Sequence, residues 1–130
     1  ISLGGDENKI KFLDTIPYLS KLKPPIFATE KTAKFLAQNG VKARKLYKIY
    51  EGKTPNILEY FQKNVIDLAI NINDIYMKKH VNDDYSIRRS AVDHNITLFT
   101  NLKKAELFIK AVVEKKLEDL PIKSWDEYRI

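Results

Sequence analysis

Short apolar segments alternate with amphipathic segments along the whole chain, and this alternation restricts the fold more than any other feature. The apolar segments have the length of strands, and the segments between them repeat their apolar residues at helical spacing. Such an order is typical of successive βαβ units in a parallel sheet. We therefore predict an α/β fold: a three-layer Rossmann-like domain with a five-stranded parallel sheet flanked by helices. The predicted strands are residues 1–3, 26–28, 41–49, 66–70 and 96–99.

Two of these strands differ in pattern, and so in their expected place in the sheet. Residues 66–70 are almost continuously apolar, as expected of a central parallel strand that is buried on both faces. Residues 41–49 mix apolar with charged side chains, so both faces of that strand cannot be buried. We therefore expect residues 41–49 at an edge of the sheet.

Residues that favour helix ends frame the predicted helices. Thr29 precedes one helix as its N-cap, and Gly40 follows it in the left-handed closing position. Asn56 and Asn101 precede two later helices as N-caps. The helix after Asn101 is predicted to bury a stripe formed by Ala105, Phe108, Ile109, Val112 and Val113.

Three stretches depart from this regular order. Pro17 interrupts the helical spacing after the first strand, so we expect a kink or a restart there with Thr15 as the cap. A long polar loop is expected over residues 71–85, followed by a short helix over 86–94. The C-terminal tail, residues 115–130, is charged, and a short turn is expected in it because Ser124 and Glu127 have capping-box spacing. The apolar residues that we expect to anchor the tail are Leu117, Leu120, Ile122, Trp125 and Tyr128.

The composition restricts the kind of site that the chain can build. A chain of 130 residues fits one domain, residues 1–130, and the absence of cysteine excludes disulfides, a thiol nucleophile and cysteine-based metal sites. With only His80 and His94 present, no histidine-rich metal site is expected either. The first residue is not methionine and a strand is predicted to begin at once, so we interpret the chain as a fragment of a longer polypeptide.

The net charge of +6 raises the question of nucleic-acid binding. The lysines are scattered, however, and no stretch interleaves them with aromatic residues as a base-stacking surface does. The apolar runs are too short to span a membrane, and the first residues lack the order of a secretion signal. We therefore expect a soluble, cytoplasmic protein that binds neither nucleic acid nor membranes.

Polar residues follow three of the predicted strands, at the edge where an open parallel sheet binds its ligands. Thr29 and Thr32 stand at a helix start, where hydroxyls and free backbone N–H groups suit an anion. Lys48 precedes a second helix start, and Asn71 and Asn73 offer amides for a ribose, a base or an amide group. Each group alone is explained by ordinary caps and turns. Because three loops bring such groups to one edge, we favour a ligand site.

A catalytic site is less well supported by the sequence. His80 lies near Asp83 and Asp84, which leaves an acid–base pair open, although a lone loop histidine is more often idle. The pair Arg88 and Arg89 is expected to cover a helix face rather than to bind a phosphate. No nucleophile–base arrangement, Walker loop or dinucleotide fingerprint is present. The sequence therefore does not predict catalysis by this domain.

Several blocks of sequence together resemble a known family. The blocks are residues 27–33, FATEKTA, residues 51–57, EGKTPNI, residues 66–71, IDLAIN, and residues 87–93, IRRSAVD. In order and spacing they resemble the methylglyoxal-synthase-like domain of the carbamoyl-phosphate synthetase large chain. Thr100 and Asn101 with residues 105–108 add a fifth block, so the resemblance covers roughly residues 4–115.

This resemblance implies a five-stranded parallel sheet and an allosteric role in ATP-dependent carbamoyl phosphate synthesis, which serves pyrimidine and arginine biosynthesis. The synthetase domains of the same large chain would carry the ligase chemistry with ATP and Mg, and the glutaminase small chain would be a further partner. The domain itself would be non-catalytic and would need no cofactor and no metal.

The resemblance also implies which residues bind the effector. In relatives that respond to UMP or IMP, two threonines and lysines hold the phosphate, and relatives that bind N-acetylglutamate have tryptophan at the position of Lys48. Lysine at this position favours a nucleotide, but residues 71–74 depart from the threonine-rich sequence of nucleotide-regulated relatives, so N-acetylglutamate stays open. Lys9 is only an approximate match, because the turn before it differs in length. The implied effector-binding residues are Thr29, Thr32, Lys48, Asn71, Asn73 and Lys9.

The rival within the same fold is methylglyoxal synthase, a lyase that eliminates phosphate from dihydroxyacetone phosphate. It uses an aspartate in the glycine-rich loop after the third strand. Here that loop, residues 51–56, has no aspartate, although His80 lies near the position of a histidine in that family. We therefore expect a regulatory domain and keep the lyase as the alternative.

Overall fold

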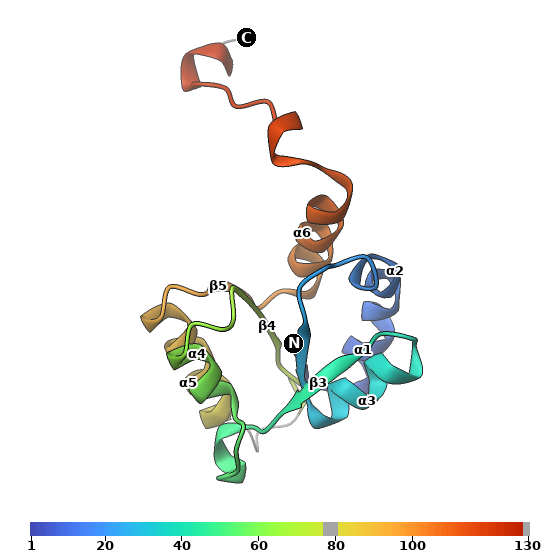
Figure 1. Cartoon of the computed structure of the whole chain (residues 1–130), viewed down its shortest axis with the longest axis vertical. Helices are drawn as coiled ribbons and strands as arrows, with labels where there is room; N and C mark the ends of the chain where they lie inside the picture. The colour runs from blue at the N-terminus through green and yellow to red at the C-terminus, as the bar shows by residue number, and fades with distance from the viewer. Residues whose placement is uncertain (77–80, 129–130) are drawn as a thin grey trace.

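The computed structural model describes residues 1–76 and 81–128, and in these residues parallel strands alternate with helices (Figure 1). The predicted α/β class is thereby confirmed. The strands are β1 (Ser2–Leu3), β2 (Ile26–Thr29), β3 (Ala43–Leu46), β4 (Leu68–Ile72) and β5 (Thr97–Phe99). The α-helices are α1 (Asp6–Phe12), α2 (Ile16–Leu19), α3 (Glu30–Gln38), α4 (Ile57–Gln62), α5 (Val81–Asp93) and α6 (Leu102–Glu114). The 3₁₀ turns are η1 (Leu13–Thr15), η2 (Ile49–Glu51), η4 (Leu117–Asp119) and η5 (Trp125–Tyr128).

The prediction of one five-stranded sheet is wrong. The described strands form a three-stranded sheet in the order β1-β4-β5 and a two-stranded sheet of β2 and β3, and every pairing is parallel. β3 pairs with β2 alone, which agrees with the edge position expected for residues 41–49.

The reason for the division lies at β1, which has only two residues. Its neighbour Ile1 is held by β2 through two backbone hydrogen bonds: the Ile1 nitrogen donates to the Phe27 oxygen at 2.7 Å, and the Thr29 N–H donates to the Ile1 oxygen at 3.2 Å. The next donor in the row, the Leu3 N–H, binds the Thr32 hydroxyl oxygen at 3.0 Å and not the backbone of β2. The two sheets therefore meet along one residue, and their order in space is β3, β2, β1, β4, β5.

Helices cover both faces of the strands and bury two separate apolar clusters. On one face α1, α2, α3 and α6 pack on a cluster that includes Phe12, Leu36 and Ile109. On the other face α4 and α5 pack on a cluster that includes Phe61 and Ala91 (Figure 1). This is the layered arrangement that binary patterning predicts for a parallel sheet with helices on both sides.

The segment around Pro17 restarts as predicted, but without the predicted cap. α1 ends at Phe12, and α2 begins at Ile16 with Pro17 in its first turn, where a missing N–H costs nothing. Thr15 has helical φ and ψ angles and its hydroxyl makes no capping bond. The oxygen is instead buried, with no hydrogen-bond partner among the described residues.

Two predicted boundaries around β4 are also wrong. β4 extends to Ile72, so Asn71 lies inside the strand rather than after it. α5 begins at Val81, five residues before the predicted start, so Asp83 and Asp84 belong to its first turn and not to a loop. Carboxylates in a first helical turn interact favourably with the positive end of the helix dipole, which the prediction overlooked. His80 lies outside the described residues.

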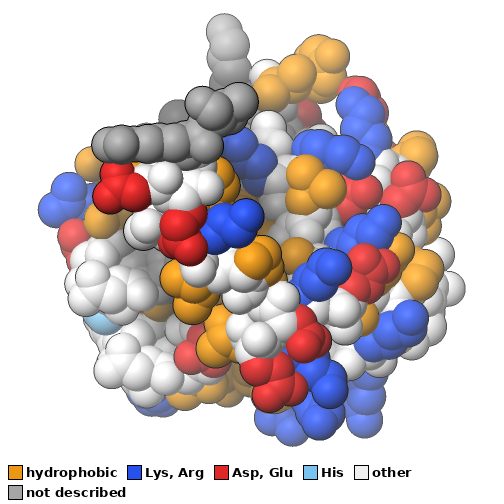
Figure 2. Space-filling model, turned by 90° about the horizontal axis from the view of Figure 1, so that it is seen from above, with side chains coloured by type: hydrophobic (Ala, Val, Ile, Leu, Met, Phe, Trp, Pro, Cys, Tyr) orange, Lys and Arg blue, Asp and Glu red, His pale blue; other side chains and the backbone are white. Residues whose placement is uncertain are grey.

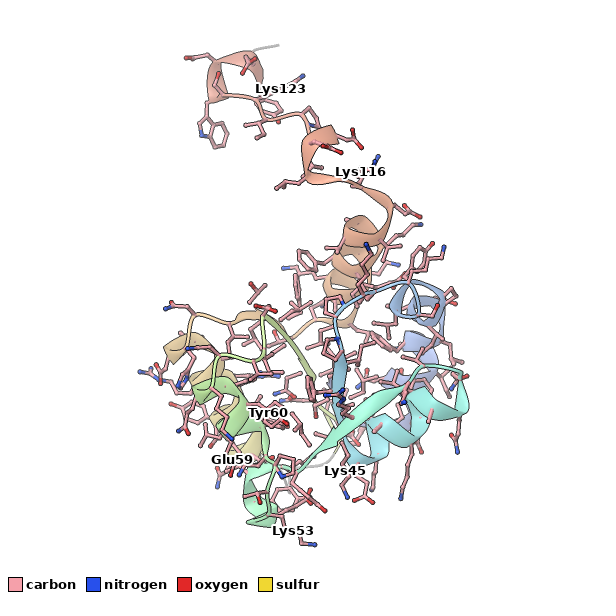
Figure 3. The ribbon with its side chains drawn as sticks, in the orientation of Figure 1. Lys45, Lys53, Glu59, Tyr60, Lys116 and Lys123 are labelled. Carbon is pink, nitrogen blue, oxygen red and sulfur yellow. The ribbon has the colours of Figure 1, made fainter. Side chains whose placement is uncertain are left out.

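α6 and the tail bury less apolar surface than predicted. In the expected stripe of α6, Ala105 and Ile109 are buried, whereas Phe108 is 39% and Val112 51% exposed. The tail beyond Glu114 runs away from the α/β body (Figure 1), and Lys116 and Lys123 mark its course in Figure 3. Its expected anchors are exposed, Trp125 at 92%, so the predicted anchoring is wrong. No helix in residues 1–76 and 81–128 is long and apolar enough to cross a membrane.

Candidate functional site

Three buried hydroxyls meet where β1 and β2 end and α3 begins. Thr29 occupies the N-cap position of α3, yet its side chain makes no capping bond. The Thr29 Oγ1 lies 3.1 Å from the Thr32 Oγ1 and 3.5 Å from the Ser2 Oγ, and all three residues are buried. The Thr29 side chain therefore does not pair with the first backbone N–H groups of α3. Unpaired N–H groups at a helix start are the geometry that favours an anion.

Glycines bring the loops after β1 and β4 into direct contact. A Cβ atom on Gly4 would lie 2.4 Å from the backbone nitrogen of Asp74, so only glycine fits there. The Asn8 amide joins the same loops, donating to the Gly4 oxygen at 2.6 Å and to the Asn73 oxygen at 3.1 Å. The backbone at the ends of β1 and β4 is thereby held in one arrangement.

β4 and the residue that follows it supply two side-chain oxygens that have no partner among the described residues. Asn71 is 1% exposed, and its Oδ1 is buried without a hydrogen bond, while its Nδ2 donates to the Asp84 backbone oxygen at 3.5 Å. The Oδ1 of Asn73 is likewise buried without a partner. Buried polar atoms are almost always hydrogen-bonded, so two free acceptors near a helix start point to a missing donor.

Lys48 and the start of α5 form the other side of the site. The Tyr50 N–H donates to the Asp83 Oδ1 at 3.2 Å, which ties η2 to α5, and the Lys48 Nζ lies 5.8 Å from the centre of the Tyr50 ring. Burial raises the pKa of the Asp84 carboxyl, and the positive charges of Lys48 and Arg88 oppose this rise. Lys48 and Arg88 are thus both close enough to Asp84 to act on its ionisation.

Three of the predicted site residues, Thr29, Thr32 and Asn71, lie in one row of neighbours. Thr32 contacts Thr29, Thr29 contacts Ser2, Ser2 lies opposite Asn71 in the strand register, and the Asn71 Nδ2 donates to the Asp84 backbone oxygen. Lys48 is linked to this row only through the effect of its charge on Asp84. Asn73 follows β4 directly.

Lys9 lies apart from this row. Its Nζ binds the Asp6 carboxylate at 2.9 Å, at a shallow groove between α1 and α3 that Lys31 and Lys34 also line. Neither Lys31 nor Lys34 belongs to the contacts that join Thr29 to Lys48. The structure therefore does not bring Lys9 together with the other predicted residues.

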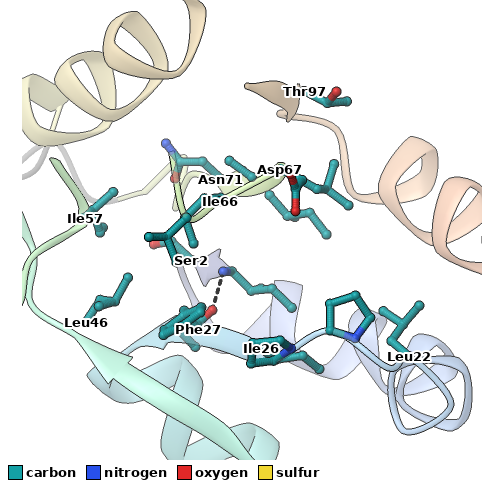
Figure 4. Close-up of a pocket in the computed structure, with 18 of the residues that line it drawn as sticks. Ser2, Leu22, Ile26, Phe27, Leu46, Ile57, Ile66, Asp67, Asn71 and Thr97 are labelled. Atoms are coloured by element: carbon teal, nitrogen blue, oxygen red, sulfur yellow. Dashed lines mark hydrogen bonds between the residues drawn. The ribbon is translucent and has the colours of Figure 1, made fainter. Parts of the chain in front are cut away.

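An apolar cavity of about 490 Å³ opens beside the hydroxyls (Figure 4). Ser2, Thr29 and Asn71 line one end, and apart from Asp67 and Thr97 the rest of its wall is mostly apolar, with Phe27 from β2 and residues from both helical layers such as Ile57. The cavity therefore has a polar end and a mostly apolar interior.

Comparison with known proteins shows which family the chain belongs to. A family model described as an MGS-like domain matches residues 11–100. The chain belongs to the MGS-like domain family. The match begins at the end of α1 and ends just after β5, and so includes Thr29, Thr32, Lys48 and Asn71 but not Ser2.

Curated relatives of this MGS-like domain are far longer than the chain. It is 33% identical over 123 residues to the carbamoyl phosphate synthase large chain of Methanothrix thermoacetophila, covering 95% of this chain and 11% of that protein. It is 37% identical over 122 residues to the C-terminal section of the large chain of Methanocaldococcus jannaschii, covering 94% and 19%. With the corresponding section of Aquifex aeolicus it shares 33% over 115 residues, covering 88% and 21%. The chain thus spans between about a tenth and a fifth of these relatives.

The sequence interpretation of this MGS-like domain missed three polar residues. Ser2 was counted only as part of a strand, and Arg88 only as surface cover, yet the Nε of Arg88 is buried and has no hydrogen-bond partner among the described residues. Asp84 was considered only as a partner of His80. The spacing of Asp84 and Arg88, four residues apart, was the available signal, since such residues share a helix face.

Charge on the surface of the MGS-like domain is mixed. On the face drawn in Figure 2, Lys and Arg side chains are interspersed with Asp and Glu. Several charged side chains of the domain pair within a helix, such as Arg89 with Asp93 at 3.1 Å and Lys11 with Glu7 at 2.6 Å. The excess of positive charge is therefore spread over the surface and is not gathered into one field on this face.

Proposed function

We propose that this MGS-like domain is the effector-binding module of a carbamoyl phosphate synthase large chain, and that its ligand is a nucleoside monophosphate such as UMP or IMP. The relatives named above support the first half of the proposal. The site supports the second half through one observation in particular. The Thr29 hydroxyl stands at the N-cap of α3 without capping it, beside a second buried hydroxyl.

The phosphate would bind at the start of α3. Helix N-termini stabilise anions through free N–H groups and the helix dipole, and α3 has nine residues over which that dipole develops. The Thr29 hydroxyl can donate to a phosphate oxygen, and Lys48 would supply the opposite charge. Arg88 on α5 acts through its charge on Asp84 and would add a second positive charge.

The rest of the ligand would satisfy the free acceptors of β4. The phosphate monoester of a nucleotide is mostly without a proton at neutral pH, whereas a ribose hydroxyl or a base N–H can donate one. The Oδ1 atoms of Asn71 and Asn73 therefore suit the nucleoside part of the ligand better than its phosphate. N-acetylglutamate also carries an N–H donor and stays as the alternative effector.

The regulatory step would act on other parts of the large chain. An effector changes activity only by binding two conformations of the enzyme with different affinity. The loops after β1 and β4 and the start of α5 meet at the site, so a bound ligand would favour the conformation in which these three elements are held together. The ATP and Mg chemistry, and the contact with a glutaminase small chain, would belong to the remainder of the enzyme.

Calorimetric titration of the chain with UMP, IMP, N-acetylglutamate and inorganic phosphate tests the proposal. Binding of UMP or IMP that is tighter than phosphate binding and weakens at least tenfold in Thr29→Val and in Lys48→Met is the expected result. Lys9→Met is the matched control, because Lys9 lies outside the row, and it should leave the affinity unchanged. If N-acetylglutamate binds most tightly, it replaces the nucleotide as the proposed effector. Equal affinities in the parent chain and all variants would contradict the proposed site.

A second candidate, a lyase acting on dihydroxyacetone phosphate, is favoured by one observation. Asp84 is a carboxylate at the site with a raised pKa, which is the property of a general base. Release of phosphate from dihydroxyacetone phosphate by the chain, and its loss in Asp84→Asn, would favour this candidate. Absence of release would leave the regulatory function as the better account.

A further inference from the structure

The tail beyond α6 repeats one short pattern of apolar and acidic residues. In residues 117–120 and again in residues 125–128, two carboxylates stand between two large apolar side chains. Each stretch contains a 3₁₀ turn, η4 in the first and η5 in the second. Residues three apart lie on the same side of such a turn, so Trp125 and Tyr128 form an apolar ridge on η5, beside Asp126 and Glu127.

The apolar ridge of η5 is uncovered in the part of the chain that the structure describes. Trp125 is 92% and Tyr128 62% exposed, and the tail leaves α6 in the direction away from α1 and α3 (Figure 1). A single exposed apolar residue is ordinary, whereas a tryptophan and a tyrosine side by side on a surface are typical of protein–protein contacts. The ridge and its two carboxylates therefore have the chemistry of a docking segment.

A groove of about 310 Å³ between α1 and α3 has the complementary chemistry. Ile10 from α1 and Phe35 from α3 form its apolar part, and Ile10 is 66% exposed. Three lysines and one aspartate also line the groove and give it a net charge of +2, three positive charges less one negative: Lys9, Lys31, Lys34 and Asp6. An apolar ridge bordered by acids matches an apolar groove bordered by lysines.

Two of the three lysines can bind an acidic partner. Lys9 is already held by Asp6 at 2.9 Å, with its side chain only 14% exposed. Lys34 pairs with Glu30 at 3.3 Å, but its side chain is 73% exposed, and such a pair contributes little to stability and can be exchanged for another. Lys31 is exposed in the first turn of α3. Carboxylates from outside the chain can therefore reach Lys31 and Lys34.

We propose that η5 of one copy of the chain docks in the groove between α1 and α3 of a second copy, and that the second copy returns the same contact. Trp125 and Tyr128 would cover Ile10 and Phe35, and the η5 carboxylates would lie beside the lysines. The Trp125 ring would also attract these cations through its face. This inference goes beyond the proposed effector function and does not depend on it.

Other seats for η5 on the same copy fit less well. The tail points away from its own α1 and α3, so it does not reach its own groove in this arrangement (Figure 1). The apolar cavity beside Phe27 offers no lysine or arginine among the described residues that line it, so the η5 carboxylates would be buried there without a partner.

The chain between α6 and η5 is long enough for an exchange. Residues 115–124 contain no α-helix, and ten residues of extended chain span up to about 30 Å. Exchange in both directions makes the same contact twice, which closes the assembly as a dimer. Because two contacts act together in one dimer, a weak single contact is sufficient at high protein concentration.

Sedimentation of the whole chain over micromolar to millimolar concentrations tests the exchange. The parent is expected to pass from monomer to dimer, and the groove variant, Lys31→Glu with Lys34→Glu, to dimerise at least about tenfold more weakly. The tail variant, Trp125→Ser with Tyr128→Ser, should lose dimerisation likewise. The matched control, Lys103→Glu with Lys104→Glu, reverses two lysines at the start of α6 and should dimerise as the parent does.

A mixture of the two defective variants separates exchange from any other association. The groove variant keeps an intact tail and the tail variant keeps an intact groove, so together they can form one of the two contacts. The mixture should therefore form heterodimers at concentrations where each variant alone is a monomer. A mixture that stays monomeric at every concentration would overturn the proposal, as would a parent chain that never dimerises.

Trp125 is the only tryptophan of the chain, so its fluorescence reports directly on η5. The emission of the parent should move to shorter wavelength as the concentration rises, and the emission of the groove variant should stay that of an exposed indole. Emission of a buried indole at every dilution would overturn the proposal in favour of docking within one copy. Neither measurement uses a nucleotide, so its outcome is separate from that of the effector proposal.

Discussion

Thr29 and Thr32 each carry a hydroxyl group, but the two hydroxyls make different contacts. The Thr32 oxygen accepts the Leu3 N–H and thereby ends the row of bonds between β1 and β2. The Thr29 oxygen contacts only other hydroxyls among the described residues and stands at a helix start. At this scale a residue that stabilises the fold and a residue proposed to bind the ligand are three positions apart.

Thr32→Val is expected to destabilise the fold by about 1–3 kcal/mol, because it leaves the buried Leu3 N–H without a partner. Thr32→Ser keeps the acceptor and should recover most of that loss. Thr29→Val should cost less stability than Thr32→Val while weakening ligand binding more. Urea unfolding measures the stabilities, and a greater loss for Thr29→Val would contradict these roles.

Asp84 is expected to make stability depend on pH. Its pKa in the folded chain is raised, mainly by burial, so the folded state binds this proton more tightly than the unfolded state does. The carboxyl therefore lowers stability as pH rises from its unfolded to its folded pKa, and Asp84→Asn should be more stable than the parent at pH 7 but not at pH 3. Asp93→Asn, on an exposed ion pair of the same helix, is the control.

The same carboxylate would also oppose a bound phosphate. Asp84→Asn should therefore tighten nucleotide binding at pH 7, and binding by the parent should strengthen as pH falls toward the pKa of Asp84. Weaker binding by the variant would mean that Asp84 contacts a donor on the ligand.

At the scale of single elements, the sequence was a reliable guide wherever a local pattern decides the structure. Asn56 and Asn101 cap their helices as predicted, accepting from Glu59 and Lys104 N–H groups at 3.0 Å, and Gly40 adopts a positive φ of 81°. Boundaries that depend on distant residues were not predictable. α5 starts early because its first turn bonds to η2 through Asp83, a contact between residues far apart in sequence.

The candidate site shows the same division. Thr29 and Thr32 were chosen from a helix start and Lys48 from a strand end, which are local signals, whereas Asn71 was chosen as a loop residue and lies inside β4. Arg88 was not chosen, although its spacing of four residues from Asp84 was a usable signal. Lys9 lies apart from the other predicted residues, because its direction depends on how α1 packs against α3, which no local pattern states.

The contact between two loops gives a prediction for an element. Gly4→Ala should destabilise the fold by about 2 kcal/mol or more, because its Cβ would meet the Asp74 backbone at 2.4 Å and that backbone cannot move aside as a side chain can. Gly40→Ala is the comparison: apart from its chain neighbours, no atom of the described residues lies within 4 Å of an added Cβ, so its positive φ is what opposes alanine. Thermal unfolding ranks the two, and a harmless Gly4→Ala would contradict the close approach.

At the scale of the whole molecule, two helical layers and two sheets surround the apolar cavity, and a tail extends from the α/β body. The alternation of apolar and amphipathic segments predicted the layers and the parallel strands, since both follow from burial. It could not predict that the strands form two sheets. This division depends on the Thr32 hydroxyl, which binds the Leu3 N–H in place of the backbone of β2. Ser2, Thr29 and Asn71 of the candidate site line the polar end of this cavity.

Removal of the tail should have little effect on the body. Its apolar residues, such as Ile122 at 92% exposure, bury little surface, so a chain that ends at Lys115 should unfold within about 2 °C of the parent. A drop of 10 °C would show that the tail packs on the body in solution.

The measurement that tests the central claim most directly is an NMR titration of the chain with UMP. The account predicts that the backbone amides of Glu30, Lys31 and Thr32 and the side-chain amide of Asn71 shift together, with one affinity, and that Lys48→Met weakens all of them. Shifts confined to the groove around Lys9 and Lys34, or shifts that leave the start of α3 unchanged, would contradict it.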